Sequence, residues 1–245
     1  MSLHHRIDGD AERVVVMSGS IGSTTEMWEA QIVALTPHFR VIRVDHPGHG
    51  GSPLLETRTI ESIAHEVLTL LDELDIPRFS FCGLSLGGAI AMRLALDVPE
   101  RIERLVLVAT GARIATPDFW EERAATVRHR GLEAIVDAAM ERWFTPTFGD
   151  VRRYRAMLLS NQAEGYARCC EALRGWDARG ELGVLCAPTL AVAGRDDPAT
   201  PPSDLKAIAA EIRGTHLVTI DDARHLVNVE QPEAFNVALL SHLAA

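Results

Sequence analysis

The sequence predicts an α/β fold in which a mostly parallel central sheet is flanked by helices and carries an inserted helical cap. Short β-branched runs that end at Gly or Asp alternate with helical patterns at both ends of the chain, as is typical of parallel strands buried on both faces. Between these ends the strand signal disappears and helix-like stretches dominate. We therefore predict a core formed by residues 1–114 and 178–245 and a cap formed by residues 115–177.

Each predicted element follows from a local pattern. Val14–Met17 and Val41–Val44 are β-branched runs that lead into loops, so we assign both as strands. Between residues 60 and 74 apolar residues recur at steps of three and four, which predicts an amphipathic helix. The later elements, in order, are a strand at 79–82, a helix at 89–96, strands at 105–108 and 188–193, a helix at 203–212, a strand at 215–220 and a helix at 231–243.

Composition and charge restrict the partners. The chain has 245 residues and a formal net charge of -10, which argues against nucleic acid or an anionic membrane as a partner, because both would need a basic face. The sequence has no run of about 18 apolar residues that could span a bilayer, and its first residues lack an apolar signal region. We expect a cytoplasmic protein with a small-molecule substrate; a homo-oligomer is compatible with the sequence.

The four cysteines show no CxxC motif and no Cys/His metal spacing. We therefore expect no structural metal and no disulfide framework. Cys82 and Cys186 are interpreted as small buried apolar residues in or near strands.

The motif Gly83-Leu84-Ser85-Leu86-Gly87 lies between the strand at 79–82 and the helix at 89–96. A Gly-x-Ser-x-Gly turn in this context is a nucleophile elbow, in which the serine backbone is strained and the hydroxyl is presented above the sheet edge. We predict that Ser85 is a catalytic nucleophile. The amide of Leu86, at the start of the helix, could then face a developing oxyanion.

A serine nucleophile needs an imidazole to accept its proton and a carboxylate to orient that imidazole. His225 follows a late strand, where a loop at the carboxyl edge of the sheet could reach Ser85. The loop after the preceding strand offers two acids, Asp196 and Asp197, and spacing alone does not separate them. A second oxyanion donor should come from the loop at 18–22: we favour the amide of Ile21, with Ser20 as the alternative.

Together these elements resemble the α/β-hydrolase superfamily, and the loop at 45–52 is similar to its usual aspartate-x-x-glycine-histidine-glycine-x-serine loop. Further segments resemble the 3-oxoadipate enol-lactonases: Met27-Trp28, 142–146, 165–170, 197–202 and 225–232. The resemblance implies Ser85 as nucleophile, His225 as base, Asp197 as the orienting acid, and the amides of Ile21 and Leu86 as the oxyanion hole. The sequence departs from the lactonase pattern at Gly19, at Ile21 and at His46-Pro47.

The resemblance also implies an activity: hydrolysis of 3-oxoadipate enol-lactone without a cofactor. Such a substrate carries a carboxylate, which needs a cation or hydrogen-bond donors. The candidates in the predicted cap are Arg142, Arg168 and Arg174, with Trp143 as a packing face or indole donor. The alternatives are a general carboxylesterase, a perhydrolase or a carbon-carbon hydrolase with the same triad. A noncatalytic ligand-binding member of the fold would predict loss of the triad residues, which are present here.

Overall fold

The computed structural model describes residues 2–245 and has a seven-stranded sheet with the order β1-β3-β2-β4-β5-β6-β7. β1 runs antiparallel to β3, and every other neighbouring pair is parallel. The predicted fold class is therefore confirmed. The strands are β1 (His5–Asp8), β2 (Val14–Ser18), β3 (Arg40–Val44), β4 (Phe79–Leu84), β5 (Ile102–Val108), β6 (Thr189–Gly194) and β7 (His216–Ile220).

The edge strand β1 is the one strand that the sequence pattern does not predict. Its residues are His, Arg, Ile and Asp, none of them buried, so no alternation of apolar and polar residues marks it. It forms because its backbone pairs with β3, where His5 lies opposite Val44. A strand defined by pairing rather than by burial leaves little trace in the sequence.

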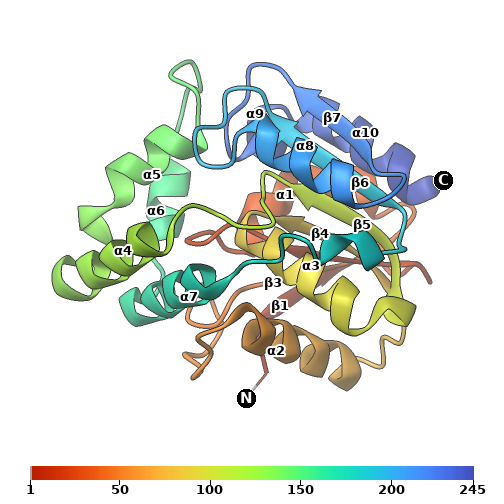
Figure 1. Cartoon of the computed structure of the whole chain (residues 1–245), viewed down its shortest axis with the longest axis horizontal. Coiled ribbons are helices and arrows are strands. Elements are labelled where there is room, and N and C mark those ends of the chain that lie inside the picture. Colours follow the sequence, from red (N-terminus) through yellow and green to blue (C-terminus); the bar gives the residue numbers. More distant parts are fainter. Residues whose placement is uncertain (1) are drawn as a thin grey trace.

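Helices cover both faces of the sheet (Figure 1). α1 (Glu29–Leu35) and α10 (Pro232–Ala244) pack against each other on one face, while α2 (Ile60–Glu73), α3 (Leu86–Asp97) and α8 (Pro202–Glu211) cover the other. Every residue of β2, β4 and β6 is buried, as expected for strands covered on both faces. The core therefore holds the central strands rigidly, and the loops at their carboxyl ends start from fixed positions.

Four helices follow β5 and group at one end of the sheet (Figure 1): α4 (Pro117–Arg130), α5 (Val136–Trp143), α6 (Arg152–Leu159) and α7 (Ala163–Gly175). We call residues 117–175 the α4–α7 segment. It contains no strand, and its two longest helices, α4 and α7, pack against each other. The domain boundaries at 115 and 177 stay a prediction. Short helical turns complete the fold: η1 (Thr25–Trp28), η2 (Pro99–Arg101), η3 (Leu132–Ala134), η4 (Leu182–Val184) and the one-turn helix α9 (Val227–Glu230).

Backbone contacts join the α4–α7 segment to the core at two places. The amide of Gln162 donates to the carbonyl of Gly48 at 3.0 Å, and beside this bond a Cβ on Gly165 would lie 2.6 Å from the Cα of Gly48. On the other side of the segment, the amide of Leu226 donates to the carbonyl of Trp143 at 3.1 Å. The segment is therefore held against the loops that follow β3 and β7.

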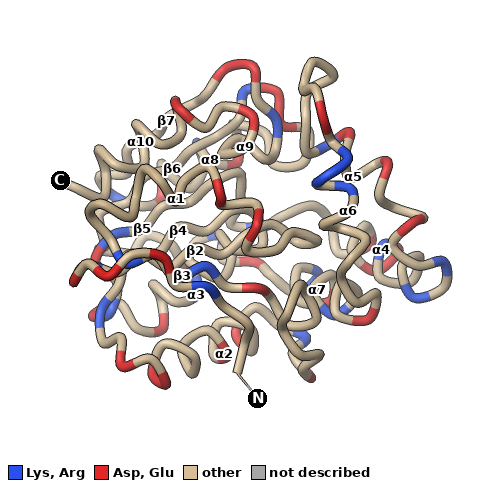
Figure 2. The backbone as a smooth tube through the Cα atoms, turned by 180° about the vertical axis from the view of Figure 1, so that it is seen from behind, with Lys and Arg blue, Asp and Glu red and all other residues tan. Residues whose placement is uncertain are grey.

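Acidic and basic residues are interspersed over the molecule, with one short basic run on α6 (Figure 2). The arginines of that run, Arg152, Arg153 and Arg155, pair with Asp150, Glu29 and Asp137. Because carboxylates on the same protein neutralise it, the run does not form a free basic face.

Two further findings concern single sequence features. Among residues 2–245, no helix has both the length and the apolar character needed to cross a membrane. Cys82 is buried as predicted, but the prediction for Cys186 is wrong, because this residue lies in the loop before β6 with its side chain exposed.

Candidate active site

Ser85 lies at the junction of β4 and α3 in a strained backbone conformation, with φ 59° and ψ -112°. The turn is tight on both sides of the serine. A Cβ on Gly83 would lie 2.1 Å from the carbonyl oxygen of Gly87, and a Cβ on Gly87 would lie 2.0 Å from the carbonyl oxygen of Ser18. Only glycine fits at either position. The sequence therefore produces the sharp turn that the nucleophile-elbow motif predicts.

Neighbouring groups hold the strained turn in place. The amide of Ser85 donates to the carbonyl of Val108 at 2.9 Å, and the hydroxyl of Thr110 donates to the carbonyl of Ser85 at 2.8 Å. Both partners come from β5 or the residues just after it, which is the strand beside β4 in the sheet. The position of Ser85 is thus fixed by the sheet and not only by its own helix.

His225 and Asp197 form a buried pair beside this turn. Nδ1 of His225 lies 2.8 Å from Oδ2 of Asp197, and both side chains are almost fully buried. Burial by itself raises the pKa of Asp197, but the charge and hydrogen bond of His225, together with hydrogen bonds from Thr200 and Ala199, outweigh it and lower the pKa. Asp197 is therefore held as a carboxylate, which can orient the imidazole.

The geometry separates the two acids that spacing leaves open. Asp196 is exposed, and its amide donates to the carbonyl of Ala223, so its side chain does not face His225. Asp197 also accepts a hydrogen bond from the hydroxyl of Thr200 at 2.8 Å. Sequence reasoning missed Thr200. A weak signal was available: the Asx turn that the amide of Ala199 closes on the Asp197 carboxylate brings the next residue, Thr200, close to the same carboxylate.

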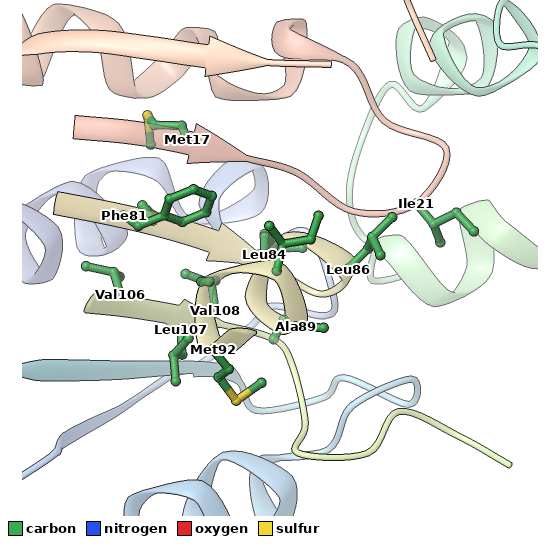
Figure 3. Close-up of a cluster of buried hydrophobic side chains, with 14 of the residues drawn as sticks. Met17, Ile21, Phe81, Leu84, Leu86, Ala89, Met92, Val106, Leu107 and Val108 are labelled. Carbon is green, nitrogen blue, oxygen red and sulfur yellow. The ribbon is translucent and has the colours of Figure 1, made fainter. Parts of the chain in front are cut away.

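Ile21, in the loop after β2, and Leu86, at the start of α3, come from two segments that are joined by a backbone hydrogen bond. The amide of Gly87 donates to the carbonyl of Gly19 at 2.9 Å, which ties the loop after β2 to the start of α3. Figure 3 shows Ile21 and Leu86 beyond the arrowheads of β2 and β4. Within residues 2–245 neither amide donates a hydrogen bond, although both residues are buried. Two buried, unpartnered amides are suited to an oxyanion.

His46 supports the loop that carries Ile21. Its Nε2 lies 3.0 Å from the carbonyl oxygen of Gly19. Burial lowers the pKa of His46, which keeps the ring neutral and leaves Nε2–H as the donor in this hydrogen bond. The histidine that departs from the lactonase pattern therefore has a structural role in this protein.

Ser85 and His225 line one pocket of about 160 Å³ that lies between the sheet edge and the α4–α7 segment. The wall away from the sheet is largely aromatic and aliphatic but includes two arginines, Arg123 and Arg142. The full lining comprises Ser20, Ile21, Ser85, Ile114, Ala115, Phe119, Trp120, Arg123, Ala139, Arg142, Trp143, Tyr166, Pro198, Ala199 and His225.

Arg123 is buried and Arg142 is half-buried, and no carboxylate of the described residues pairs with either cation. Among the described residues neither guanidinium forms a salt bridge. Burial, together with the charge of Arg123, lowers the pKa of Arg142 to about 10, so the side chain remains a cation at neutral pH. The Nε of Arg123 donates to the hydroxyl of Tyr166 at 2.8 Å. A pair of cations of this kind is suited to an anionic ligand.

Of the cations predicted to bind substrate, the structure places only Arg142 in the pocket. Arg168 pairs with Glu56 and Glu164 outside it, and the exposed Arg174 pairs with Glu121. Trp143 is buried and lines the pocket, so its role toward a substrate stays a prediction.

Sequence reasoning missed Arg123. Its signal is that it shares the buried face of α4 with Trp120, Ala124 and Val127, where a surface cation is not expected.

No three His, Cys, Asp or Glu side chains in the part of the chain that the structure describes are grouped so that they could hold a metal ion. The groups that the pocket does offer are a hydroxyl beside an imidazole and carboxylate pair, two free amides and two guanidinium groups. Chemically, this arrangement can support nucleophilic attack on a carbonyl group of an anionic molecule.

Known proteins with related sequences are hydrolases. Residues 13–232 match the family described as alpha/beta hydrolase fold. The 3-oxoadipate enol-lactonase 2 of Acinetobacter baylyi is 38% identical over 98% of this chain and 92% of its own. The crystal structure of the enol-lactonase from Burkholderia xenovorans has 38% identity and a TM-score of 0.95 over 99% of this chain and 96% of that one. An Agrobacterium fabrum relative with the provisional name carbamate hydrolase RutD is 31% identical over 98% of this chain and 96% of its own.

Proposed function

The chain belongs to the α/β-hydrolase family, and on that premise we propose that it is a serine hydrolase that opens 3-oxoadipate enol-lactone to 3-oxoadipate. The observation that carries the proposal is the composition of one pocket, in which a serine on a strained turn and a His225–Asp197 pair face two unneutralised arginines. The first group suits attack on a carbonyl, and the second suits a substrate that carries a carboxylate.

In the proposed mechanism the hydroxyl of Ser85 attacks the lactone carbonyl while Nε2 of His225 accepts its proton. Asp197 holds the imidazole through Nδ1 and stabilises the imidazolium that forms. The carbonyl oxygen becomes an oxyanion that the amides of Ile21 and Leu86 stabilise. The ring oxygen then leaves, takes the proton from Nε2 of His225 and becomes an enol that remains attached to the acyl group. Water activated by His225 hydrolyses the ester on Ser85, and the enol tautomerises to the ketone of 3-oxoadipate.

The proposed role of the α4–α7 segment is to hold the carboxylate of the substrate. Arg142 and Arg123 provide the charge, and the indole of Trp143 provides a packing face or a donor beside them. Because neither guanidinium group forms a salt bridge among the described residues, a ligand carboxylate would gain a charge-assisted hydrogen bond without displacing an internal carboxylate. A neutral ester would gain nothing from these residues.

A second candidate is hydrolysis of a carbamate, which the relative named carbamate hydrolase RutD favours. A carbamate is also attacked at a carbonyl carbon, so the same serine, histidine and amides would serve both reactions. The two candidates differ in the substrate that fills the pocket, and direct comparison of substrates separates them.

The test is to measure kcat/KM for 3-oxoadipate enol-lactone, a short p-nitrophenyl ester and carbamate, with Ser85→Ala as the blank. We expect about 10⁴ M⁻¹s⁻¹ or more for the lactone, well above the other two substrates. Strong turnover of the ester with negligible opening of the lactone would retain the serine mechanism and reject the substrate. If Ser85→Ala kept the full rate, the serine mechanism itself would be rejected.

A further inference from the structure

The hydroxyl of Ser20 lies beside the nitrogen that must move protons in the proposed reaction. Its Oγ is 3.4 Å from Nε2 of His225, and both side chains are buried. Among residues 2–245 this is the only hydrogen-bond partner of the Ser20 hydroxyl. Ser20 also lines the pocket together with Ser85. The histidine is therefore accompanied by two serines, and the proposed mechanism uses the side chain of one.

The direction of this contact follows from the other ring nitrogen. Nδ1 of His225 faces the carboxylate of Asp197, which lacks a proton, so Nδ1 carries the hydrogen of the neutral ring. Nε2 then has a lone pair, and the Ser20 hydroxyl is the donor. At 3.4 Å the contact is longer than a typical hydrogen bond, so Nε2 stays open to a second partner.

Acylation and deacylation place different groups next to Nε2 of His225. During acylation the proton comes from the hydroxyl of Ser85, which is itself the attacking group, so no second hydroxyl is needed to position the nucleophile. During deacylation the oxygen of Ser85 is esterified, and a water molecule has to be held between Nε2 and the acyl carbonyl. That carbonyl lies at the amide of Ile21, the residue next to Ser20 in the chain.

We propose that Ser20 is a positioning residue for deacylation, in which its hydroxyl holds the attacking water against Nε2 of His225. This inference rests on the proposed acylation of Ser85. The water oxygen bonds to the acyl carbon and its proton passes to Nε2. The bond from that carbon to Oγ of Ser85 then breaks, the proton returns from Nε2 to Oγ, and the free acid leaves. Without the Ser20 hydroxyl the water loses one of the groups that orient it.

The test uses the full chain and p-nitrophenyl acetate with rapid mixing. Release of p-nitrophenol reports acylation, and mass spectrometry of the quenched protein follows the decay of the acyl group on Ser85. We expect Ser20→Ala to slow deacylation about tenfold and to change the acylation rate less than threefold. The steady-state kcat and KM should then fall together, with kcat/KM preserved. Ser20→Thr, which keeps the hydroxyl, should restore deacylation.

A matched control is Ser18→Ala, which removes another buried hydroxyl just before the same loop. The Ser18 hydroxyl has no partner within residues 2–245, so this variant should keep the wild-type ratio of the two rates. Equal slowing of both steps in Ser20→Ala, or no slowing of either, would overturn the role of Ser20. If wild-type protein forms no acyl group on Ser85, the proposed function fails instead, so the two failures are distinguishable.

Discussion

The two walls of the pocket come from different kinds of secondary structure and are held in place in different ways. On the sheet side, Ile21, Ser85 and His225 line the pocket, and Asp197 pairs with His225; the four residues lie shortly after the ends of the parallel strands β2, β4, β7 and β6. On the other side, Arg123, Arg142, Trp143 and Tyr166 come from three helices of the α4–α7 segment. The first wall is held by the sheet and its hydrogen bonds. The second depends on how the helices pack.

The contrast has a physical cause. Parallel strands bring their carboxyl ends to one edge of the sheet. The residues that follow these strands therefore lie close together, whatever the sequences of the loops. Helices such as α4 and α7 can present any face, and the face is chosen by side-chain packing. On the proposed function, the sheet edge would supply the chemistry and the α4–α7 segment the choice of substrate. The predictions below test this division.

The largest effect is expected at the sheet edge. Asp197→Asn should lower kcat about 10³- to 10⁴-fold, because the amide can stabilise the wrong tautomer of His225 and cannot balance the imidazolium charge. Asp196→Asn is the matched control: its side chain is exposed, so the rate should stay near wild type. Steady-state assays of both variants on a p-nitrophenyl ester give the comparison. An equal loss in both variants would contradict the assignment of Asp197.

A smaller and selective effect is expected in the α4–α7 segment. Arg142→Ala and Arg123→Ala should each raise KM for the anionic lactone about 10- to 100-fold, since each removes a charge-assisted hydrogen bond to the carboxylate. KM for a neutral p-nitrophenyl ester should change little. Measuring both substrates on each variant tests whether binding and chemistry are separate.

Arg174→Ala is the control for this pair, because Arg174 pairs with Glu121 outside the pocket. Its KM for the lactone should stay near wild type. If neither Arg142→Ala nor Arg123→Ala altered KM for the anionic lactone, binding of a carboxylate by this segment would be refuted.

The smallest effect concerns the junction of the two walls, where the ring of His49 stacks on Tyr166 at 6.1 Å between centroids. Burial lowers the pKa of His49 from 6.5 to about 3. Between these values the unfolded chain binds a proton that the folded protein does not, so this part of the stability is present above pH 6.5 and is lost as the pH falls. We expect a loss of about 2 kcal/mol of unfolding free energy from this group between pH 7 and pH 5.

Urea denaturation at pH 7 and pH 5 measures this loss. His49→Gln should show a smaller drop between the two pH values than the wild type, because glutamine does not titrate. His65→Gln, at an exposed histidine of α2, should keep the wild-type drop. If the unfolding free energy of His49→Gln fell between pH 7 and pH 5 as much as that of the wild type, other groups would cause the acid sensitivity.

The sequence predicted the sheet side of the pocket well and the helical side poorly. The buried strands and the Gly-x-Ser-x-Gly turn are local patterns, and six of the seven strands follow from them. The exception, β1, is defined by pairing with β3 rather than by burial. Choosing between Asp196 and Asp197 needed either the family resemblance or the coordinates, because both acids lie on one loop.

On the helical side, the position of a cation along a helix does not reveal its surroundings. Arg168 and Arg174 carry the same charge as Arg142, yet carboxylates on neighbouring elements pair with them. Arg123 lies on the same helix face as Trp120, but its hydrogen bond to Tyr166 depends on the packing of α4 against α7. Long-range packing decides these outcomes, and a single sequence does not encode it in any short motif.

The contact between Gly48 and Gly165 fixes the distance between α7 and the loop that follows β3. A Cβ on either glycine would lie within 2.6 Å of the other residue's Cα, so here the spacing between the helices and the core is set by backbone thickness alone. One added methyl group would act as a wedge at this point. Alanine at either position would therefore displace the start of α7, which carries Tyr166, and so change the shape of the pocket while every residue that lines it stays the same.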